Sequence, residues 1–347
     1  MAPGGGYGAR DALPPAAGRV MARALVAPDS FKGTFDARTV ADALVRGIRN
    51  AGWEADRCPV ADGGEGTLEL LVEALNGSLE PASATDPLGR PVACHVGRAG
   101  DTAIVEVAQA SGLGLVAEHE RDAWRASTRG TGELVVAAAA AGAREILVAA
   151  GGSATTDGGE GAIEAIRGGG GLRDARLVVL CDVALAFEDA PRVFGPQKGA
   201  DPATVARLEA RLDALAQTLP RDPRGVALTG AAGGLAGGLW AAFGAELRPG
   251  APAVLDALGV DARMRAAELV VTGEGRIDDQ SFGGKVVGEL ARRTCVAGVP
   301  LHVVAGSTTL DADGRRAAGL AGLWIAPTLA EIEAAGRALA VAATAGG

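Results

Sequence analysis

The stretch Val270-Val-Thr-Gly-Glu-Gly-Arg-Ile-Asp-Asp-Gln-Ser-Phe-Gly-Gly-Lys285 combines a short apolar run with a polar segment rich in glycine. The run from Leu269 to Val271 predicts a buried strand, and we expect a loop to follow it. Five charged residues of that loop stand among its glycines: Glu274, Arg276, Asp278, Asp279 and Lys285. Ligands of open α/β sheets bind at the carboxyl ends of the strands. The loop is therefore a candidate phosphate-handling site, and the alternative is an ordinary solvated loop.

The order of strand, glycine-rich loop and helix recurs along the chain. Residues 22–27 predict a strand that ends in loop 28–33, and Asp36 is a plausible N-cap for the helix that follows. Residues 58–61 predict a second strand, which ends in loop 62–66 before another helix. This alternation is typical of a parallel sheet with crossover helices.

The pattern changes after residue 78. Turns at 86–90 and 97–100 separate short apolar runs that predict antiparallel strands, and the βα alternation returns from residue 127. We therefore predict an α/β fold with two domains. Residues 21–85 and 262–347 form a parallel-sheet domain from both chain ends, and residues 86–261 form an inserted α/β domain that begins in antiparallel strands. Residues 1–20 are expected to be a disordered leader, with Met21 as a plausible translation start.

Composition excludes several functions. The net charge of −9 argues against a nucleic-acid partner, because non-specific binding to nucleic acid needs a basic surface. No apolar run reaches the ~18 residues of a membrane span, and residues 1–20 lack the apolar core of a signal peptide. The four cysteines include no Cys-x-x-Cys pair, which suits reduced thiols. We expect a cytoplasmic protein without a membrane partner, and the sequence leaves its oligomeric state open.

The lysines are few and share a setting. Only three of the 33 basic residues are lysines, and each lies beside or within a glycine-rich segment: Lys32, Lys198 and Lys285. A lysine ammonium is a compact, flexible point charge, whereas arginine presents a planar fork. We interpret the three lysines as contacts for phosphate or carboxylate groups.

Phosphoryl transfer needs carboxylates for Mg²⁺ and for the attacking hydroxyl, together with cations around the phosphate. The loops supply acids at seven positions: Asp29, Asp62, Glu65, Asp157, Asp182, Glu274 and Asp278. They supply cations in the three lysines and Arg276. The signatures of P-loop, dinucleotide-binding and serine-hydrolase proteins are absent. The same residue types would also serve a protein that only binds small anions.

Seven motifs, in order, resemble the two-domain bacterial glycerate kinase family. They are Ala-Pro-Asp-Ser-Phe-Lys-Gly (27–33), Ala-Asp-Gly-Gly-Glu-Gly-Thr (61–67), Gly-Thr-Gly-Glu-Leu (130–134), Gly-Gly-Ser-Ala-Thr-Thr-Asp-Gly-Gly (151–159), Val-Phe-Gly-Pro-Gln-Lys-Gly-Ala (193–200), Gly-Ala-Ala-Gly-Gly-Leu (230–235) and Thr-Gly-Glu-Gly-Arg-Ile-Asp (272–278). The resemblance implies a Rossmann-like domain made from both chain ends and ATP-dependent, Mg²⁺-assisted phosphorylation of D-glycerate, with 2-phosphoglycerate favoured. A kinase of a related hydroxy acid and a non-catalytic hydroxy-acid sensor are the alternatives.

The matched motifs suggest roles for individual residues. We expect Asp182 or Asp278 to orient the attacking hydroxyl, Lys198 to act beside it, and Asp62, Glu65 or Glu274 to bind Mg²⁺. Substrate and phosphate contacts are expected from Asp29, Ser30, Lys32, Gly33, Gly63, Gly64, Gly151, Gly152, Ser153, Thr155, Asp157, Gln197, Gly233, Gly234, Arg276 and Lys285. The sequence departs from the family at Ala184-Leu185-Ala186, where many members have Thr-Asn-Pro, so any polar contact from these positions is missing.

Overall fold

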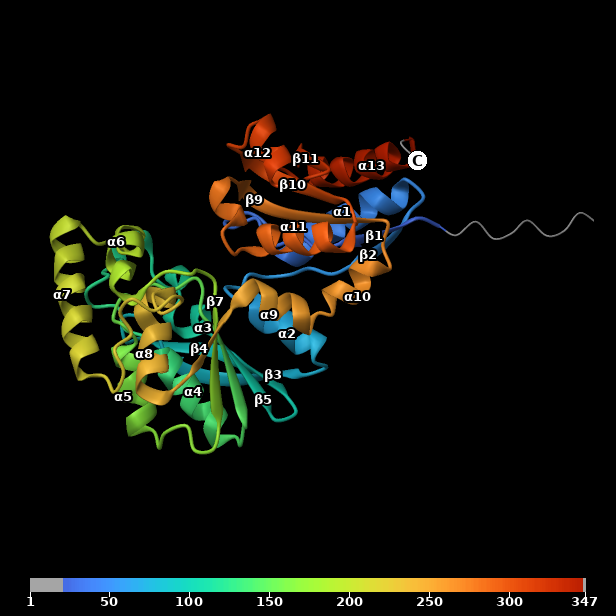
Figure 1. Cartoon of the computed structure of the whole chain (residues 1–347). Helices are drawn as coiled ribbons and strands as arrows, with labels where there is room; N and C mark the ends of the chain where they lie inside the picture. The colour runs from blue at the N-terminus through green and yellow to red at the C-terminus, as the bar shows by residue number, and fades with distance from the viewer. Residues whose placement is uncertain (1–20, 346–347) are drawn as a thin grey trace, which may run out of the picture.

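The computed structural model describes residues 21–345 and contains two β-sheets, each with helices packed on it (Figure 1). The predicted leader, residues 1–20, lies outside the described residues. Five strands form the first sheet: β1 (Arg23–Val26), β2 (Glu54–Arg57), β9 (Leu269–Ile277), β10 (Leu301–Thr308) and β11 (Gly322–Ile325). Their order is β11-β10-β9-β1-β2, and all of their pairings are parallel. Both chain ends therefore build one parallel sheet, as the fold class predicted.

The second sheet is mixed. Its strands are β3 (Ser78–Thr85), β4 (Pro91–Ala99), β5 (Thr102–Glu106), β6 (Glu145–Ala149), β7 (Arg176–Cys181) and β8 (Glu246–Pro249), and they neighbour one another in chain order. The pairs β3–β4 and β4–β5 are antiparallel, and the remaining pairs are parallel. Strand β3 precedes our predicted boundary at residue 85. It nevertheless belongs to the second sheet, because the turn after Thr85 lets all eight of its residues pair with β4.

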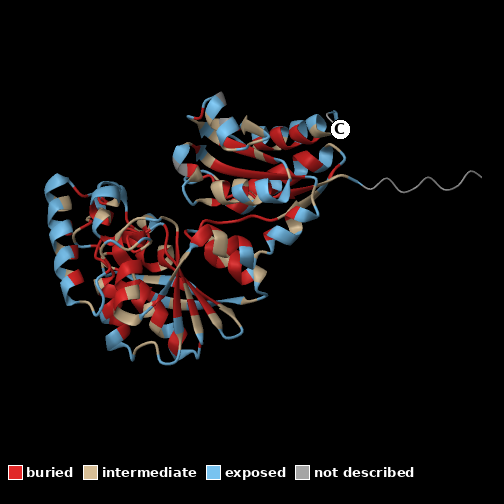
Figure 2. Ribbon diagram, in the orientation of Figure 1, coloured by how far each residue is buried: buried red, intermediate tan, exposed pale blue. Residues whose placement is uncertain are grey.

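Helices cover both faces of the first sheet. The helices α1 (Ala37–Asn50) and α13 (Leu329–Ala345) pack together on one face, and α11 (Val286–Ala297) and α10 (Val260–Arg265) lie on the other; α12 (Ala312–Ala317) precedes β11. The side chain of Asp36 caps α1 by accepting a hydrogen bond from the Thr39 amide at 2.7 Å. Both helix layers turn buried residues toward the strands (Figure 2).

The second sheet is covered in the same way. One face packs against α4 (Arg129–Ala140), α5 (Glu160–Gly168) and α8 (Leu235–Phe243), and the other against α2 (Thr67–Ala74) and α9 (Gly250–Ala257). Three further helices are α3 (Val107–Ser111), α6 (Ala190–Phe194) and α7 (Pro202–Thr218). The side chain of Asp201 caps α7 by accepting a hydrogen bond from the Thr204 amide at 2.7 Å.

Strand β9 is longer than we predicted. We predicted that this strand ends at Val271, but it continues to Ile277 because β10 pairs beside it as far as Thr308. Gly275 allows this strand to approach Phe31, since a Cβ at Gly275 would stand 3.1 Å from the Phe31 Cα. Glu274 and Arg276 therefore belong to a strand, and the loop starts after Ile277.

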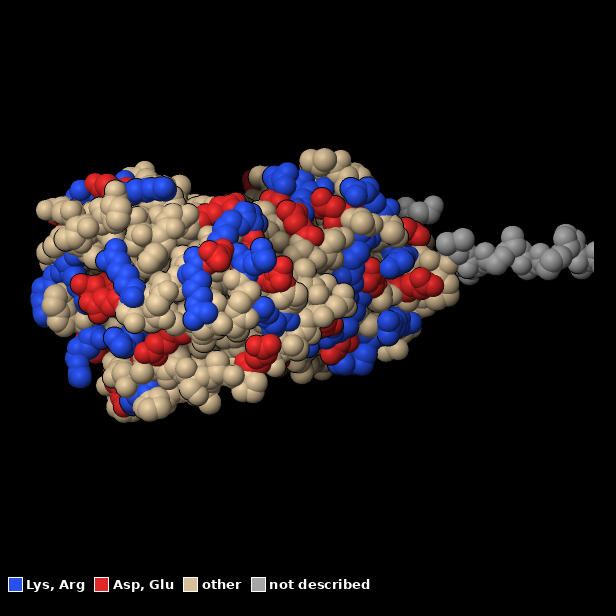
Figure 3. All heavy atoms as spheres, turned by 90° about the horizontal axis from the view of Figure 1, so that it is seen from below, with Lys and Arg blue, Asp and Glu red and all other residues tan. Residues whose placement is uncertain are grey.

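The surface charges are mixed on the face of the molecule that Figure 3 shows. Basic and acidic side chains are interspersed over the face seen in Figure 3, without a large area of one sign. Within residues 21–345, no helix has the length and apolar character needed to cross a bilayer.

Candidate functional site

A cavity of about 1020 Å³ lies where strands of both sheets end. The segments after β1 and β2 line one part of it, and the carboxyl ends of β5, β6 and β7 line another. Its size is at the upper end of the range for small-molecule sites. The topology of α/β sheets places ligands at this end of the strands.

The cavity brings together residues from five of the seven motifs: 27–33, 61–67, 151–159, 193–200 and 230–235. The predicted residues in its lining are Asp29, Ser30, Lys32, Gly33, Glu65, Gly151, Gly152, Ser153, Asp182, Gln197, Lys198 and Gly233. The predicted residues outside its lining are Asp62, Gly63, Gly64, Thr155, Asp157, Gly234, Glu274, Arg276, Asp278 and Lys285.

Asp29, Lys32 and Asp62 form a charged group at one end of the cavity. The Lys32 ammonium donates to Asp62 Oδ2 at 3.1 Å, and Asp62 Oδ1 accepts from the Gly64 amide at 3.0 Å. Asp29 is buried, and its own amide donates to the Gly273 carbonyl at 2.9 Å. Burial, together with the negative charge of Asp62, raises the pKa of Asp29 to about 8. This end of the cavity therefore favours the arrival of a further cation.

Glu274 and Lys285 are paired with each other. The Lys285 ammonium donates to Glu274 Oε1 at 3.1 Å, while Glu274 Oε2 is buried and has no hydrogen-bond partner within the described chain. A buried carboxylate oxygen without a partner is unfavourable unless a ligand completes it. Arg276 forms a separate pair with Asp278, whose carboxylate lies 3.4 Å from the guanidinium.

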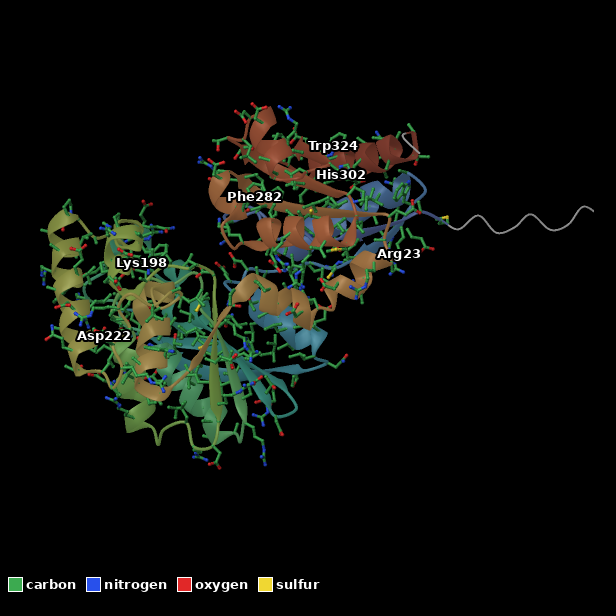
Figure 4. The ribbon with its side chains drawn as sticks, in the orientation of Figure 1. Arg23, Lys198, Asp222, Phe282, His302 and Trp324 are labelled. Carbon is green, nitrogen blue, oxygen red and sulfur yellow. The ribbon has the colours of Figure 1, made fainter. Side chains whose placement is uncertain are left out.

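Lys198 is the buried cation of the cavity. It ends the short 3₁₀ turn Pro196–Lys198 near α6 and is labelled in Figure 4. Its ammonium donates to Ser153 Oγ at 2.9 Å and to the Thr155 carbonyl at 2.5 Å. Among the described residues no carboxylate forms an ion pair with it, and burial lowers its pKa to about 8. An anionic ligand would supply the missing negative charge.

Asp182 follows directly after β7. It lines the cavity close to Gly151, because a Cβ at Gly151 would stand 3.3 Å from Asp182 Oδ2. Burial raises the pKa of Asp182 to about 6, and the charge of Asp62 adds to this effect, whereas Lys32 and Lys198 oppose it. A carboxylate with this pKa is ionised at neutral pH and can still accept a proton.

Asp157 has a position different from the other predicted acids. It is fully buried, and its carboxylate accepts from the Thr128 amide and hydroxyl and from the amides of Gly159 and Gly161, at 2.8 to 3.2 Å. These bonds tie the starts of α4 and α5 together. The carboxylate is thus fully engaged inside the protein.

Several motif glycines hold the loops against each other. A Cβ at Gly151 would stand 2.4 Å from the Gly64 Cα, and one at Gly63 would stand 2.7 Å from the Gly250 Cα. At Gly233, where φ is +68°, a Cβ would stand 1.9 Å from the Thr155 carbonyl oxygen. Only glycine permits such backbone contact. These positions shape the cavity by close packing, in addition to any exposed amide they offer to an anion.

Our sequence reasoning missed Glu106. It ends β5, is only 2% exposed and lines the cavity. Its Oε2 accepts from the amides of Gly66 and Leu68 at 3.1 and 3.0 Å. Burial raises the pKa of Glu106 to about 7, and nearby Glu69 and Glu65 add to the effect. A carboxylate at the end of a strand was the available signal, but no glycine-rich loop follows Glu106. We also did not predict two arginines of the lining, Arg38 and Arg121, because only the rare lysines were interpreted as phosphate or carboxylate contacts.

Comparison with known proteins points to one family. A family model described as the glycerate kinase family matches residues 24–170 and 167–344. The chain is 38% identical to glycerate 2-kinase of Escherichia coli K12 over 326 residues, which cover 83% of this chain and 86% of the relative. It is 38% identical over 332 residues to glycerate kinase of Bacillus subtilis 168, with the same two coverages. A crystal structure from Salmonella typhimurium LT2, described as a candidate glycerate kinase 2, superposes with a TM-score of 0.77 at 34% identity, covering 94% of this chain and 99% of that chain.

Proposed function

Since this chain belongs to the glycerate kinase family, we propose that it transfers the γ-phosphoryl group of ATP to D-glycerate in the cavity between its two sheets. The relative named glycerate 2-kinase favours 2-phosphoglycerate as the product. The observation that supports the proposal best is the convergence of Asp182, Lys198 and the Asp29–Lys32 segment on one cavity. Phosphoryl transfer depends mainly on positioning and on charge, and this cavity offers both.

Asp182 is our choice for the carboxylate that orients the attacking hydroxyl. It lines the cavity, is half-buried, and has no ion-pair partner within residues 21–345. Asp278, the alternative from the sequence, is not part of the lining and lies beside Arg276. The proton of the attacking hydroxyl would pass to the Asp182 carboxylate as the new phosphorus–oxygen bond forms and the bond from the γ-phosphorus to ADP breaks, with ADP as the leaving group.

Lys198 would bind the negative charge that enters the cavity. The ammonium is held by Ser153 and Thr155, so it needs little reorganisation to meet a carboxylate or phosphoryl oxygen. Lys32 belongs to the charged group with Asp29 and Asp62 and lines the same cavity, where it would meet a second anionic oxygen. We assign Lys32 and Lys198 to contacts with the reacting anions. Lys285 remains paired with Glu274 and has no assigned contact with the substrates.

The residues present fit a Mg²⁺ ion that arrives with ATP. Within the described chain, no three His, Cys, Asp or Glu side chains are arranged as a complete metal cage. Mg²⁺ usually binds through one or two carboxylates, with phosphate oxygens and water completing its shell. The unpartnered Oε2 of Glu274 and the nearby Asp29 and Asp62 suit this role, and Glu65 lines the cavity as a further candidate. When bound, the ion would neutralise phosphate charge.

A coupled assay of ADP release tests the proposal. D-glycerate, hydroxypyruvate and tartronate are supplied separately with Mg·ATP, and phosphorus NMR of the product distinguishes O2 from O3. Release of ADP with D-glycerate as the preferred substrate is the expected result. Preference for another acid would make the chain a kinase of that acid. Binding of D-glycerate without ADP release would make it a sensor. The cytoplasmic location stays a prediction from the sequence.

A further inference from the structure

Glu106 lies on the same face of the second sheet as Leu180, which is near the end of β7; Asp182 follows directly after that strand. In the parallel register Glu106 pairs with Ala149 of β6, and Ala149 pairs with Leu180 of β7. Paired residues of parallel strands point to the same face, and α2 covers this face beside Leu180. Asp182 lies two residues beyond Leu180. The buried carboxylate of Glu106 and the half-buried carboxylate of Asp182 thus flank the end of β6, where Gly151 lies close to Asp182.

The two oxygens of Glu106 have different surroundings. Oε2 accepts from the amides of Gly66 and Leu68, at the start of α2. Oε1 makes no hydrogen bond within residues 21–345, and no basic side chain of that range forms an ion pair with Glu106. One oxygen is therefore anchored, and the other remains available in the cavity that Glu106 lines.

An available carboxylate oxygen accepts hydrogen bonds and repels anions. It is therefore a poor partner for the carboxylate of glycerate or the phosphates of ATP, and a good one for a hydroxyl group. Glycerate carries two hydroxyl groups, of which only one is phosphorylated. The other hydroxyl needs an acceptor if the enzyme is to distinguish glycerate from acids with a single hydroxyl.

The spacing of the two strands that lead to these carboxylates suits this task. Strands β5 and β7 are separated by two strand spacings, which amount to about 9.5 Å. Carboxylates at about this separation, each about 2.7 Å from one hydroxyl group, would place the two hydroxyl oxygens of the substrate roughly 4 Å apart. Adjacent hydroxyl groups on a three-carbon acid fit such a space.

We propose that Glu106 is a specificity-determining residue, whose free Oε1 accepts the hydroxyl of glycerate that is not phosphorylated while Asp182 faces the reacting hydroxyl. The inference rests on the proposed function, because it names the part of the substrate that the same cavity recognises. It predicts that the enzyme selects for two hydroxyl groups through one buried side chain.

The test combines Glu106→Gln with substrate analogues. The glutamine carbonyl can keep the hydrogen bonds from Gly66 and Leu68, and its amide nitrogen replaces the free acceptor with a donor. Isothermal titration calorimetry measures Kd for D-glycerate, for D-lactate, which lacks the C3 hydroxyl, and for 3-hydroxypropanoate, which lacks the C2 hydroxyl. For the wild type we expect the analogue without the recognised hydroxyl to bind about 30-fold more weakly than glycerate. In Glu106→Gln that ratio should fall below about 10, because the neutral amide can only donate to the hydroxyl and this bond is weaker than the one to a carboxylate.

Glu80→Gln is the matched control, because Glu80 is an exposed residue of β3 outside the cavity lining, and all three Kd values should stay at wild-type levels. A merely structural role of Glu106 would weaken the three ligands equally and leave the ratio unchanged, which would overturn the inference. Wild-type-like binding of glycerate by Glu106→Gln would also overturn it. Absence of ADP release by the wild type refutes the kinase proposal separately, because the Kd ratios are measured without turnover.

Discussion

Lys198→Met removes a buried charge while keeping a side chain of similar length. Lys198 is 5% exposed, and its ammonium has two neutral acceptors, Ser153 Oγ and the Thr155 carbonyl. The substitution therefore separates what the ammonium contributes to ligand binding from what it costs the folded protein. We expect ligand binding to weaken, whereas the stability of the folded protein should stay the same or increase.

The stability effect follows from the shifted pKa. Burial lowers the pKa of Lys198 from 10.5 to about 8. Below pH 8 the lysine is protonated in both the folded and the unfolded states, so its burial costs up to about 3 kcal/mol. The cost fades as the pH rises from 8 towards 10. Methionine avoids this burial cost. It also leaves the Thr155 carbonyl without its donor, which lowers the free energy of unfolding by about 1–3 kcal/mol. The melting temperature of Lys198→Met at pH 7 should therefore equal or exceed that of the wild type.

The catalytic effect is larger. A hydrogen bond to a charged group is worth about 1.5–3 kcal/mol, so losing the contact to substrate or phosphoryl oxygen should lower kcat/KM by roughly 10- to 150-fold. The coupled ADP assay gives kcat/KM, and differential scanning calorimetry gives the melting temperature. Wild-type turnover in Lys198→Met would remove the lysine from the mechanism. A fall of more than about 4 °C in melting temperature would refute the reasoning about its buried charge.

Three other changes are expected to have distinct effects. Asp182→Asn should lower kcat by about 10²–10⁴-fold; in the wild type, kcat/KM should fall below pH 6 as Asp182 is protonated, and a profile flat to pH 5 would contradict this role. Gly151→Ala places a Cβ 2.4 Å from the Gly64 Cα and should destabilise the protein by about 1–3 kcal/mol in urea unfolding, whereas Gly168→Ala, with open space around it, should not. Asp157→Asn should lower the free energy of unfolding by about 3 kcal/mol because four donors lose a charged acceptor, and unchanged stability would show that the carboxylate is dispensable there.

Local features of the fold could be predicted because the residues that determine them are close in sequence. The cap at Asp36 was predicted and is confirmed by its hydrogen bond from the amide three residues later. Asp201 and Thr328 cap their helices at the same spacing, and at Thr328 its hydroxyl and the carboxylate of Glu331 accept from each other's amides. The predicted strand 58–61 was displaced along the sequence, since β2 is Glu54–Arg57. Edge strands with polar residues give a weak apolar signal.

The candidate site was harder to predict because its contacts join distant residues. The motifs identified Lys198, but its acceptors lie 43 and 45 residues away and depend on how two loops pack. The other acids were predicted because they lie in glycine-rich loops that follow strands. No such loop follows Glu106, so the same pattern did not predict it. Lys285 could be identified as a motif residue, but its pairing with Glu274 depends on β9 continuing beyond the predicted end.

The pairing of β1 with β9 determines the order in which the chain can fold during synthesis. The Thr272 hydroxyl donates to the Ala27 carbonyl across 245 residues, so the first sheet lacks its centre until β9 has been made. The second sheet needs only the chain from β3 to β8. Contacts distant in sequence form slowly. The second sheet can therefore be complete on the ribosome before β9 has been made and has paired with β1. A chain stalled before residue 269 would expose one edge of β1 to aggregation.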